Sequence, residues 1–199
     1  LFLILAEELE TEAFWCFSPS HSFIKFQDKQ NRWYNIELTQ GAVVTDDFYM
    51  NSGFIKSKAI QTGIYLNPRT MKQTIAHMLN DLSAYYISRY GYDHFIEENS
   101  NLVLRYSPSD LTAYQHYANI CTVQALYVID ACGRPPKEQL PEYPQAHRLF
   151  KKMLQSYEKI DSLGYEEMPA EIYHNWLKQV DKAKTLPENQ PSPIIQIKK

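Results

Sequence analysis

One stretch near the start of the chain, HSFIKFQDKQNRWYNIEL at residues 21–38, decides how the first part of the protein folds. Two runs rich in aromatic and β-branched residues, at 22–27 and 32–38, flank a polar segment at 28–31. Such runs on either side of a short polar loop are typical of antiparallel strands joined by a hairpin. We therefore predict a β-hairpin here.

The second strand of this hairpin also predicts which side chains share a face. Successive side chains along a strand point to opposite sides of the sheet. We expect the apolar set on the inner face and the set that carries the polar groups on the outer face. The first set is Tyr34, Ile36 and Leu38, and the second is Trp33, Asn35 and Glu37.

The residues before the hairpin extend the β segment. The aromatic run at 13–18 predicts a further strand, which the turn residues Ser18-Pro19-Ser20 separate from the hairpin. Residues 1–10 carry an apolar helical face, made by Phe2, Leu5, Ala6 and Leu9. No capping residue precedes this face, so we expect the rear part of a helix whose front part lies upstream of Leu1.

After a transition at residues 41–68, the sequence predicts only helices. Within the transition, residues 46–50 and 56–62 are expected to form short helical turns. The predicted helices span residues 70–90, 93–105, 109–132, 145–163 and 169–183. Residues 134–144 contain four prolines and are expected to be extended. The tail from residue 186 is expected to be loose, with an edge strand at 194–197 as an alternative.

Each long helix carries an apolar stripe that we expect to face inward. In the first it is Ile75, Leu79, Leu82 and Tyr86; in the third it is Leu111, Tyr114, Ala118, Cys121, Ala125, Val128 and Cys132; in the fourth it is Leu149, Met153, Tyr157 and Ile160; in the fifth it is Ile172, Trp176 and Val180. Gly91 is expected to end the first helix, and Asp93 to cap the second.

The helical part shows signs of a repeat. Ala84 and Ala118 lie 34 residues apart in the first and third helices, with Gly91 and Pro108 at the turns between. A small helical residue, a turn glycine and a closing proline at this period resemble a tetratricopeptide repeat (TPR). The resemblance implies a TPR-like array with a concave, protein-binding surface. An unrelated helical bundle is the alternative.

Composition excludes several classes of function. The net charge is −3 and the basic residues are scattered, so no nucleic-acid-binding face is expected. The longest apolar run, residues 1–6, is far shorter than the roughly 20 residues that span a bilayer. Three cysteines do not make a disulfide framework, and the six histidines lack the spacing of a zinc site. No phosphate-binding glycine loop occurs, and we expect no cofactor.

The types and positions of three residues predict a catalytic site. His21 begins a predicted strand, and Asn35 and Glu37 lie on the next strand, on the face that His21 could share. A carboxylate or amide beside a histidine fixes its tautomer and stabilises its charged form. This is the base and orienter of a Cys-His-Asp or Cys-His-Asn site.

These residues resemble the transglutaminase-like superfamily, which has a papain-like core. In that family a histidine begins a strand, and the next strand often reads Trp, three residues, Asp or Glu, one residue, Thr. Here Trp33, Glu37 and Thr39 fit this spacing. The resemblance covers about residues 1–40. The chain also resembles those members of the family that carry helical repeats after the core. It implies His21 as the base and Glu37 as the orienter, with Asn35 as the rival to Glu37.

The resemblance also implies a nucleophile that this chain does not show at the matching position. The family's cysteine opens the helix that precedes the first strand, where the helix terminus lowers the thiol pKa. We expect that cysteine a few residues upstream of Leu1. Cys16, Ser20 and Ser22 are poor substitutes, because Cys16 lies in the middle of a strand and both serines are too close in sequence to His21.

Two functions remain open from the sequence. The first is a thiol hydrolase or acyltransferase acting on amide bonds, with the repeats binding a protein or peptide substrate. The second is a non-catalytic binding scaffold on a degenerate core. In either case we predict an α+β chain with a partial core at residues 1–66, helical repeats at 67–185 and a Pro-rich tail at 186–199. The compartment is undecided, an exported or periplasmic location being one option, and so is the oligomeric state.

Overall fold

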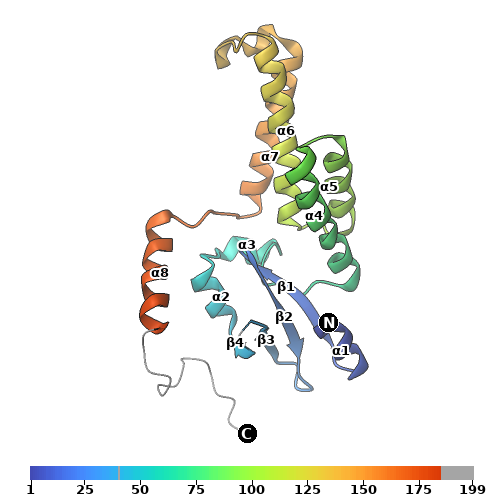
Figure 1. The fold of residues 1–199 in the computed structure, drawn as a ribbon, viewed down its shortest axis with the longest axis vertical. Helices are drawn as coiled ribbons and strands as arrows, with labels where there is room; N and C mark the ends of the chain where they lie inside the picture. Colours follow the sequence, from blue (N-terminus) through green and yellow to red (C-terminus); the bar gives the residue numbers. More distant parts are fainter. Residues whose placement is uncertain (40, 185–199) are drawn as a thin grey trace. The chain divides into compact units, whose positions relative to one another are not determined.

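In the computed structural model, which describes residues 1–39 and 41–184, the chain folds into two compact units (Figure 1). The first holds residues 1–70 and the segment that begins at Tyr165, and the second holds Met71–Gly164. The fold is α+β, as predicted, with one antiparallel sheet and several helices. The last helix belongs to the first unit, whereas the sequence analysis placed it with the helical array.

The first unit is built on a four-stranded antiparallel sheet in the order β1-β2-β3-β4. The strands are β1 (Ala13–Ser18), β2 (His21–Gln27), β3 (Trp33–Glu37) and β4 (Ala42–Val44). The three predicted strands are present, and the short β4 is an addition that the sequence analysis missed. In the register, Ile24 pairs with Ile36 and Lys25 pairs with Asn35.

The inner and outer faces of β3 are the reverse of the prediction. Asn35 and Glu37 are buried, whereas Tyr34 and Ile36 are only partly buried and Leu38 is exposed. The alternation itself was predicted correctly. The polar face lies inward because the Glu37 carboxylate and the Asn35 Nδ2 group find hydrogen-bond partners there, as described below.

Four helices complete the first unit: α1 (Phe2–Glu8), α2 (Asp46–Ser52), α3 (Ser57–Gln61) and α8 (Ala170–Lys184). The two short helices of the transition are confirmed. In α1 only Ala6 of the predicted apolar face is buried, and Leu5 and Leu9 are exposed. In α8, Ile172 is exposed rather than inward, and the side chains of Trp176 and Val180 lie outside those described.

The second unit is helical. Its elements are α4 (Met71–Tyr90), α5 (His94–Tyr106), α6 (Leu111–Ala131), the short 3-10 helix η1 (Lys137–Glu142) and α7 (Pro144–Ser162). Consecutive long helices pack side by side, and α4 also contacts α6 (Figure 1). Asp93 caps α5 as predicted, by accepting a hydrogen bond from the backbone N–H of Phe95. Residues 134–144 are not fully extended, because η1 forms within them.

The predicted inward stripes differ in outcome between helices. In α6, Leu111, Ala118, Cys121 and Ala125 are buried as predicted. In α7, Ile160 is buried but Tyr157 is exposed. In α4 the prediction is wrong, because Ile75 and Leu82 are exposed and the buried side chains are Thr74, Ala76, Asn80 and Ser83.

The alanine pair that suggested a repeat is not equivalent in packing. Ala118 is buried in α6, whereas Ala84 is exposed on α4. The small residue at the helix interface is instead Ser83, whose hydroxyl contacts the side chain of Asn99 on α5. The pair therefore adds nothing to the case for a 34-residue repeat.

Within the described ranges, no helix is both long enough and apolar enough to cross a membrane. The edge strand considered for residues 194–197, and the loose tail around it, lie outside the described residues.

Candidate active site

A tight turn places His21 at the start of β2. Ser18 pairs with His21 across the β1–β2 ladder, so only Pro19 and Ser20 form the turn. Ser20 has a φ of 55°, in the left-handed region that such short turns use. His21 is thereby fixed at the end of the sheet, on the face that also carries Phe23 and Lys25.

The ring of His21 contacts the carboxylate of Glu37, as the sequence predicted. His21 Nε2 and Glu37 Oε2 are 2.6 Å apart. The Glu37 side chain is only 4 % exposed, while the His21 side chain is 36 % exposed. The carboxylate is thus held inside the unit and the histidine reaches the surface.

Glu37 is held in place by three further hydrogen bonds. Its Oε1 accepts from the Thr39 backbone N–H at 3.0 Å and from the Thr39 hydroxyl at 2.6 Å. Its Oε2 accepts from the Tyr49 hydroxyl at 3.0 Å. Burial alone raises the pKa of Glu37, but the bonds from Thr39, His21 and Tyr49 outweigh burial and lower that pKa below its ordinary value. Glu37 is therefore a fixed carboxylate at neutral pH.

Tyr49 comes from α2 and covers both residues of the pair. Its ring stacks on Phe23 at 3.9 Å between centroids and lies nearly parallel to the His21 ring at 6.1 Å. Burial and the bond to Glu37 raise the pKa of Tyr49 above its ordinary value, so the phenol stays a donor. Gly53, the residue after α2, allows the end of this helix to lie against the β1–β2 turn, since a Cβ at Gly53 would meet Pro19 Cδ at 2.9 Å.

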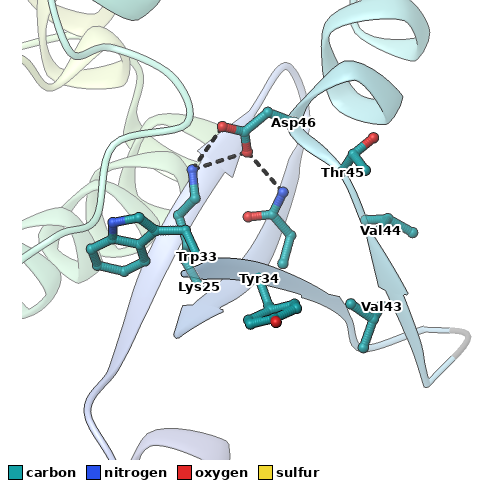
Figure 2. Close-up of a pocket in the computed structure, with 8 residues that line it drawn as sticks. Lys25, Trp33, Tyr34, Val43, Val44, Thr45 and Asp46 are labelled. Atoms are coloured by element: carbon teal, nitrogen blue, oxygen red, sulfur yellow. Dashed lines mark hydrogen bonds and ion pairs between the residues drawn. The ribbon is translucent and has the colours of Figure 1, made fainter. Parts of the chain in front are cut away.

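Asn35, the rival orienter, lies elsewhere in the site. Its Nδ2 donates to Asp46 Oδ1 at 2.7 Å, and it makes no contact with His21. The Lys25 ammonium also binds Asp46, at 2.9 and 3.0 Å, and the Leu66 carbonyl at 3.1 Å. Lys25 and Asn35 therefore both bind the Asp46 carboxylate, and Figure 2 shows Lys25 directed at it.

These three polar residues line a pocket of about 290 Å³. The rest of its wall comes from β3, β4 and the start of α2: Trp33, Tyr34, Val43, Val44 and Thr45 (Figure 2). Asn35 and Glu37 lie two residues apart on one face of β3, so the polar part of the pocket wall and the His21–Glu37 pair share that face.

The cysteine of the first unit, Cys16, is not placed to act as a nucleophile with His21. Cys16 is fully buried opposite Phe23 in the middle of the β1–β2 ladder, and burial raises its pKa to about 12. Such a thiol stays protonated and unreactive. Cys121 and Cys132 belong to the second unit. Across the parts of the chain that the structure describes, no three His, Cys, Asp or Glu side chains are grouped to hold a metal ion.

The sequence analysis missed Tyr49 and gave Thr39 only as part of a motif. The spacing from Glu37 to Tyr49 carries no strand or helix period, because the two residues lie on different elements. The sequence shows an aromatic residue in a short predicted helix that begins with two aspartates. This pattern does not reveal that the tyrosine hydroxyl donates a hydrogen bond to Glu37.

The arrangement has the geometry of a base held by a carboxylate. With the proton on Nε2 directed at Glu37, the other ring nitrogen, Nδ1, carries the lone pair that can accept a proton. Glu37 fixes the ring and stabilises its charge after protonation.

In the comparisons with known proteins, the chain matches no family model, no curated protein and no solved structure.

Proposed function

We propose that His21 and Glu37 are the base and orienter of a thiol-dependent acyl-transfer site that acts on amide bonds. The observation that carries the proposal is the 2.6 Å contact between a buried, hydrogen-bonded carboxylate and a histidine that reaches the surface. The resemblance to the transglutaminase-like superfamily supplies the nucleophile, a cysteine at the start of the helix that precedes β1.

The chemical steps follow from this pair. His21 Nδ1 takes the proton from the thiol, and the thiolate attacks the carbonyl carbon of the amide. The C–N bond then breaks, and the departing amine takes the proton back from His21. The resulting thioester passes its acyl group to water or to a second amine. Glu37 holds the imidazolium between the two proton transfers.

The competing function is a binding scaffold without catalysis. The placement of Cys16, the cysteine of the first unit, favours it, because this thiol is buried in the sheet and its pKa is raised. The helical unit would then carry the function by binding a protein or peptide. The two proposals differ in whether the intact protein presents a reactive thiol to His21.

Alkylation of the native full-length protein tests the choice. The residues upstream of Leu1 are mapped by mass spectrometry, and iodoacetamide labelling is followed from pH 5 to 9. We expect a cysteine within about ten residues of Leu1, about 15 Å of helix, that labels at pH 6 where an ordinary thiol does not.

Two variants separate the outcomes. His21→Ala is expected to slow labelling of that cysteine at pH 6 by at least about tenfold, since it removes the imidazolium partner of the thiolate. Tyr34→Phe, on the other face of β3, is the matched control and leaves the rate unchanged. Absence of such a cysteine, or a rate that His21→Ala does not alter, overturns the enzyme proposal in favour of the scaffold.

A further inference from the structure

Helix α4 carries its polar and apolar faces in the reverse of the usual order. A helix on a protein surface normally turns its large apolar side chains toward the core. Here the buried side chains are small or polar, and five large apolar ones that share a face are 49 to 67 % exposed. The buried set is Thr74, Ala76, Asn80 and Ser83, and the exposed set, called the α4 stripe below, is Met71, Ile75, Met78, Leu82 and Tyr85.

Hydrogen bonds within the second unit fix this orientation. Asn80 Nδ2 donates to Asp110 Oδ1 at 3.0 Å, and His77 Nδ1 lies 2.7 Å from Asp110 Oδ2. Asn99 Nδ2 donates to the Leu79 carbonyl at 2.8 Å and to the Ser83 hydroxyl. A rotation of α4 that buried the stripe would separate these buried polar groups from their partners. The stripe therefore stays outward within this unit.

The stripe has the spacing of a helix-pairing seam. Its five residues follow one another at intervals of four, three, four and three, which is the a/d pattern of a coiled coil. From Met71 to Tyr85 they span 15 residues, about 21 Å of helix. No charged residue interrupts them, because Lys72 and Asp81 lie on the flanks and Arg89 lies one turn beyond Tyr85.

We propose that the α4 stripe is the interface of a homodimer in which α4 packs against α4 of a second copy. The seam is complementary to itself: with a two-fold axis at Met78, an antiparallel pair sets Met71 level with Tyr85 and brings Ile75 within one residue of the level of Leu82. Asp81 of each copy then lies clear of its equivalent, so no like charges meet. This inference does not depend on the proposed catalytic function.

The exposed area is sufficient for such a pair. At these exposed fractions, five side chains of about 200 Å² each offer roughly 550 Å² per copy. Two copies bury roughly 1,100 Å², just above the approximately 1,000 Å² that a specific interface requires. An interface at this lower limit belongs to the weak or transient class, so the test must cover a wide range of concentrations.

Sedimentation velocity of the chain of residues 1–199, between about 2 and 200 μM, tests the proposal. The wild-type chain is expected to shift from monomer to dimer over this range. Met78→Glu, which places a charge in the middle of the seam, is expected to weaken dimerisation at least about 30-fold. Ala84→Glu adds the same charge at an exposed position off the stripe and is expected to leave it unchanged.

A cross-link gives a second, independent measurement. Cys132 is the partly exposed native cysteine, so the test uses the Cys132→Ser background. Met78→Cys is expected to form a disulfide-linked dimer on mild oxidation, because the two-fold axis brings both thiols together, and Ala84→Cys is not. A chain that stays monomeric at 200 μM, or a dimer that Met78→Glu leaves intact, overturns the proposal. The first of these results would indicate that the α4 stripe binds a different protein.

Discussion

Two histidine–carboxylate pairs of nearly equal length lie in the two units, and their surroundings differ. His21 and Glu37 are 2.6 Å apart in the first unit, and His77 and Asp110 are 2.7 Å apart in the second. Asp110 is the N-cap of α6, accepting from the Ala113 backbone N–H at 3.1 Å as well as from Asn80. Glu37 caps no helix, and its histidine is more exposed than His77.

The comparison teaches that the short contact alone does not mark a reactive site. A carboxylate that caps a helix and is fully buried serves to join α4 to α6, and its histidine is one of several partners. A carboxylate at the end of a strand, held by Thr39 and Tyr49, presents its histidine to the surface. We therefore assign a structural role to the pair in the second unit and keep the catalytic proposal for the first.

The largest expected effect breaks the structural pair. Asp110→Ala removes the cap of α6 and leaves the buried donors of Asn80 and Ala113 without their acceptor, so it should lower the free energy of unfolding by about 3 kcal/mol. Thermal unfolding followed by far-UV circular dichroism measures this. Asp93→Ala, which removes the exposed cap of α5, is the matched control and should cost clearly less. Equal losses would contradict the structural role of Asp110.

The next effect concerns pH and the first unit. Because the folded state lowers the pKa of Glu37, its contribution to stability is present above the unfolded pKa of about 4.3 and is lost as pH falls through the folded value. Glu37→Gln should therefore cost about 2 kcal/mol at pH 7 and much less at pH 3. Urea unfolding at both pH values, followed by tryptophan fluorescence, measures the difference, since residues 71–164 contain no tryptophan.

A difference between variant and wild type that does not shrink on acidification would show that the Glu37 carboxylate is not the stabilising group. Asp28→Asn is the control, because it removes a carboxylate of the first unit that is not part of the His21–Glu37 pair. Hydrogen bonds from Arg32 and Gln30 outweigh the effect of desolvation and lower the pKa of Asp28, which lies in the β2–β3 loop away from the His21–Glu37 pair.

Removal of one bond to Glu37 should have a smaller effect. Tyr49→Phe keeps the ring on Phe23 but deletes the hydroxyl donor, so we expect a loss of about 1 kcal/mol in the same fluorescence assay. Tyr34→Phe deletes a hydroxyl that donates to Asp28 near the surface at 3.1 Å, and should cost less. If both variants unfold at the same urea concentration, Tyr49 does not support the pair.

The smallest expected effect separates the two histidines directly. His21→Ala should change the free energy of unfolding by no more than about 0.5 kcal/mol, because the ring is partly exposed and Glu37 retains three other donors. His77→Ala should cost about 1.5 kcal/mol, since it takes a partner from the buried Asp110. Urea unfolding of both variants at pH 7 measures this, and a reversed order would reject the assignment of roles.

Much of the fold followed from local patterns. The β1–β2–β3 strands, the two short helices after them, the caps of α5 and the bounds of the long helices all come from signals within a few residues. His21 and Glu37 were found in the same way, from a histidine at a strand start and a carboxylate on the next strand. The preference for Glu37 over Asn35 came from the spacing of Trp33, Glu37 and Thr39, and the structure shows that Glu37 contacts His21 whereas Asn35 binds Asp46.

The sequence by itself determined where the chain forms strands and helices, and the alternation that sets Asn35 and Glu37 on one side of β3. Only the tertiary structure decided which side is buried. On β3 the polar side lies inward with hydrogen bonds from Tyr49 and Thr39 to Glu37 and from Asn35 to Asp46, and on α4 it lies inward with hydrogen bonds from Asn80 to Asp110 and from Asn99 to Ser83. Periodicity ranks side chains by hydrophobicity alone, whereas burial of a polar group depends on partners 2 to 30 residues away along the chain.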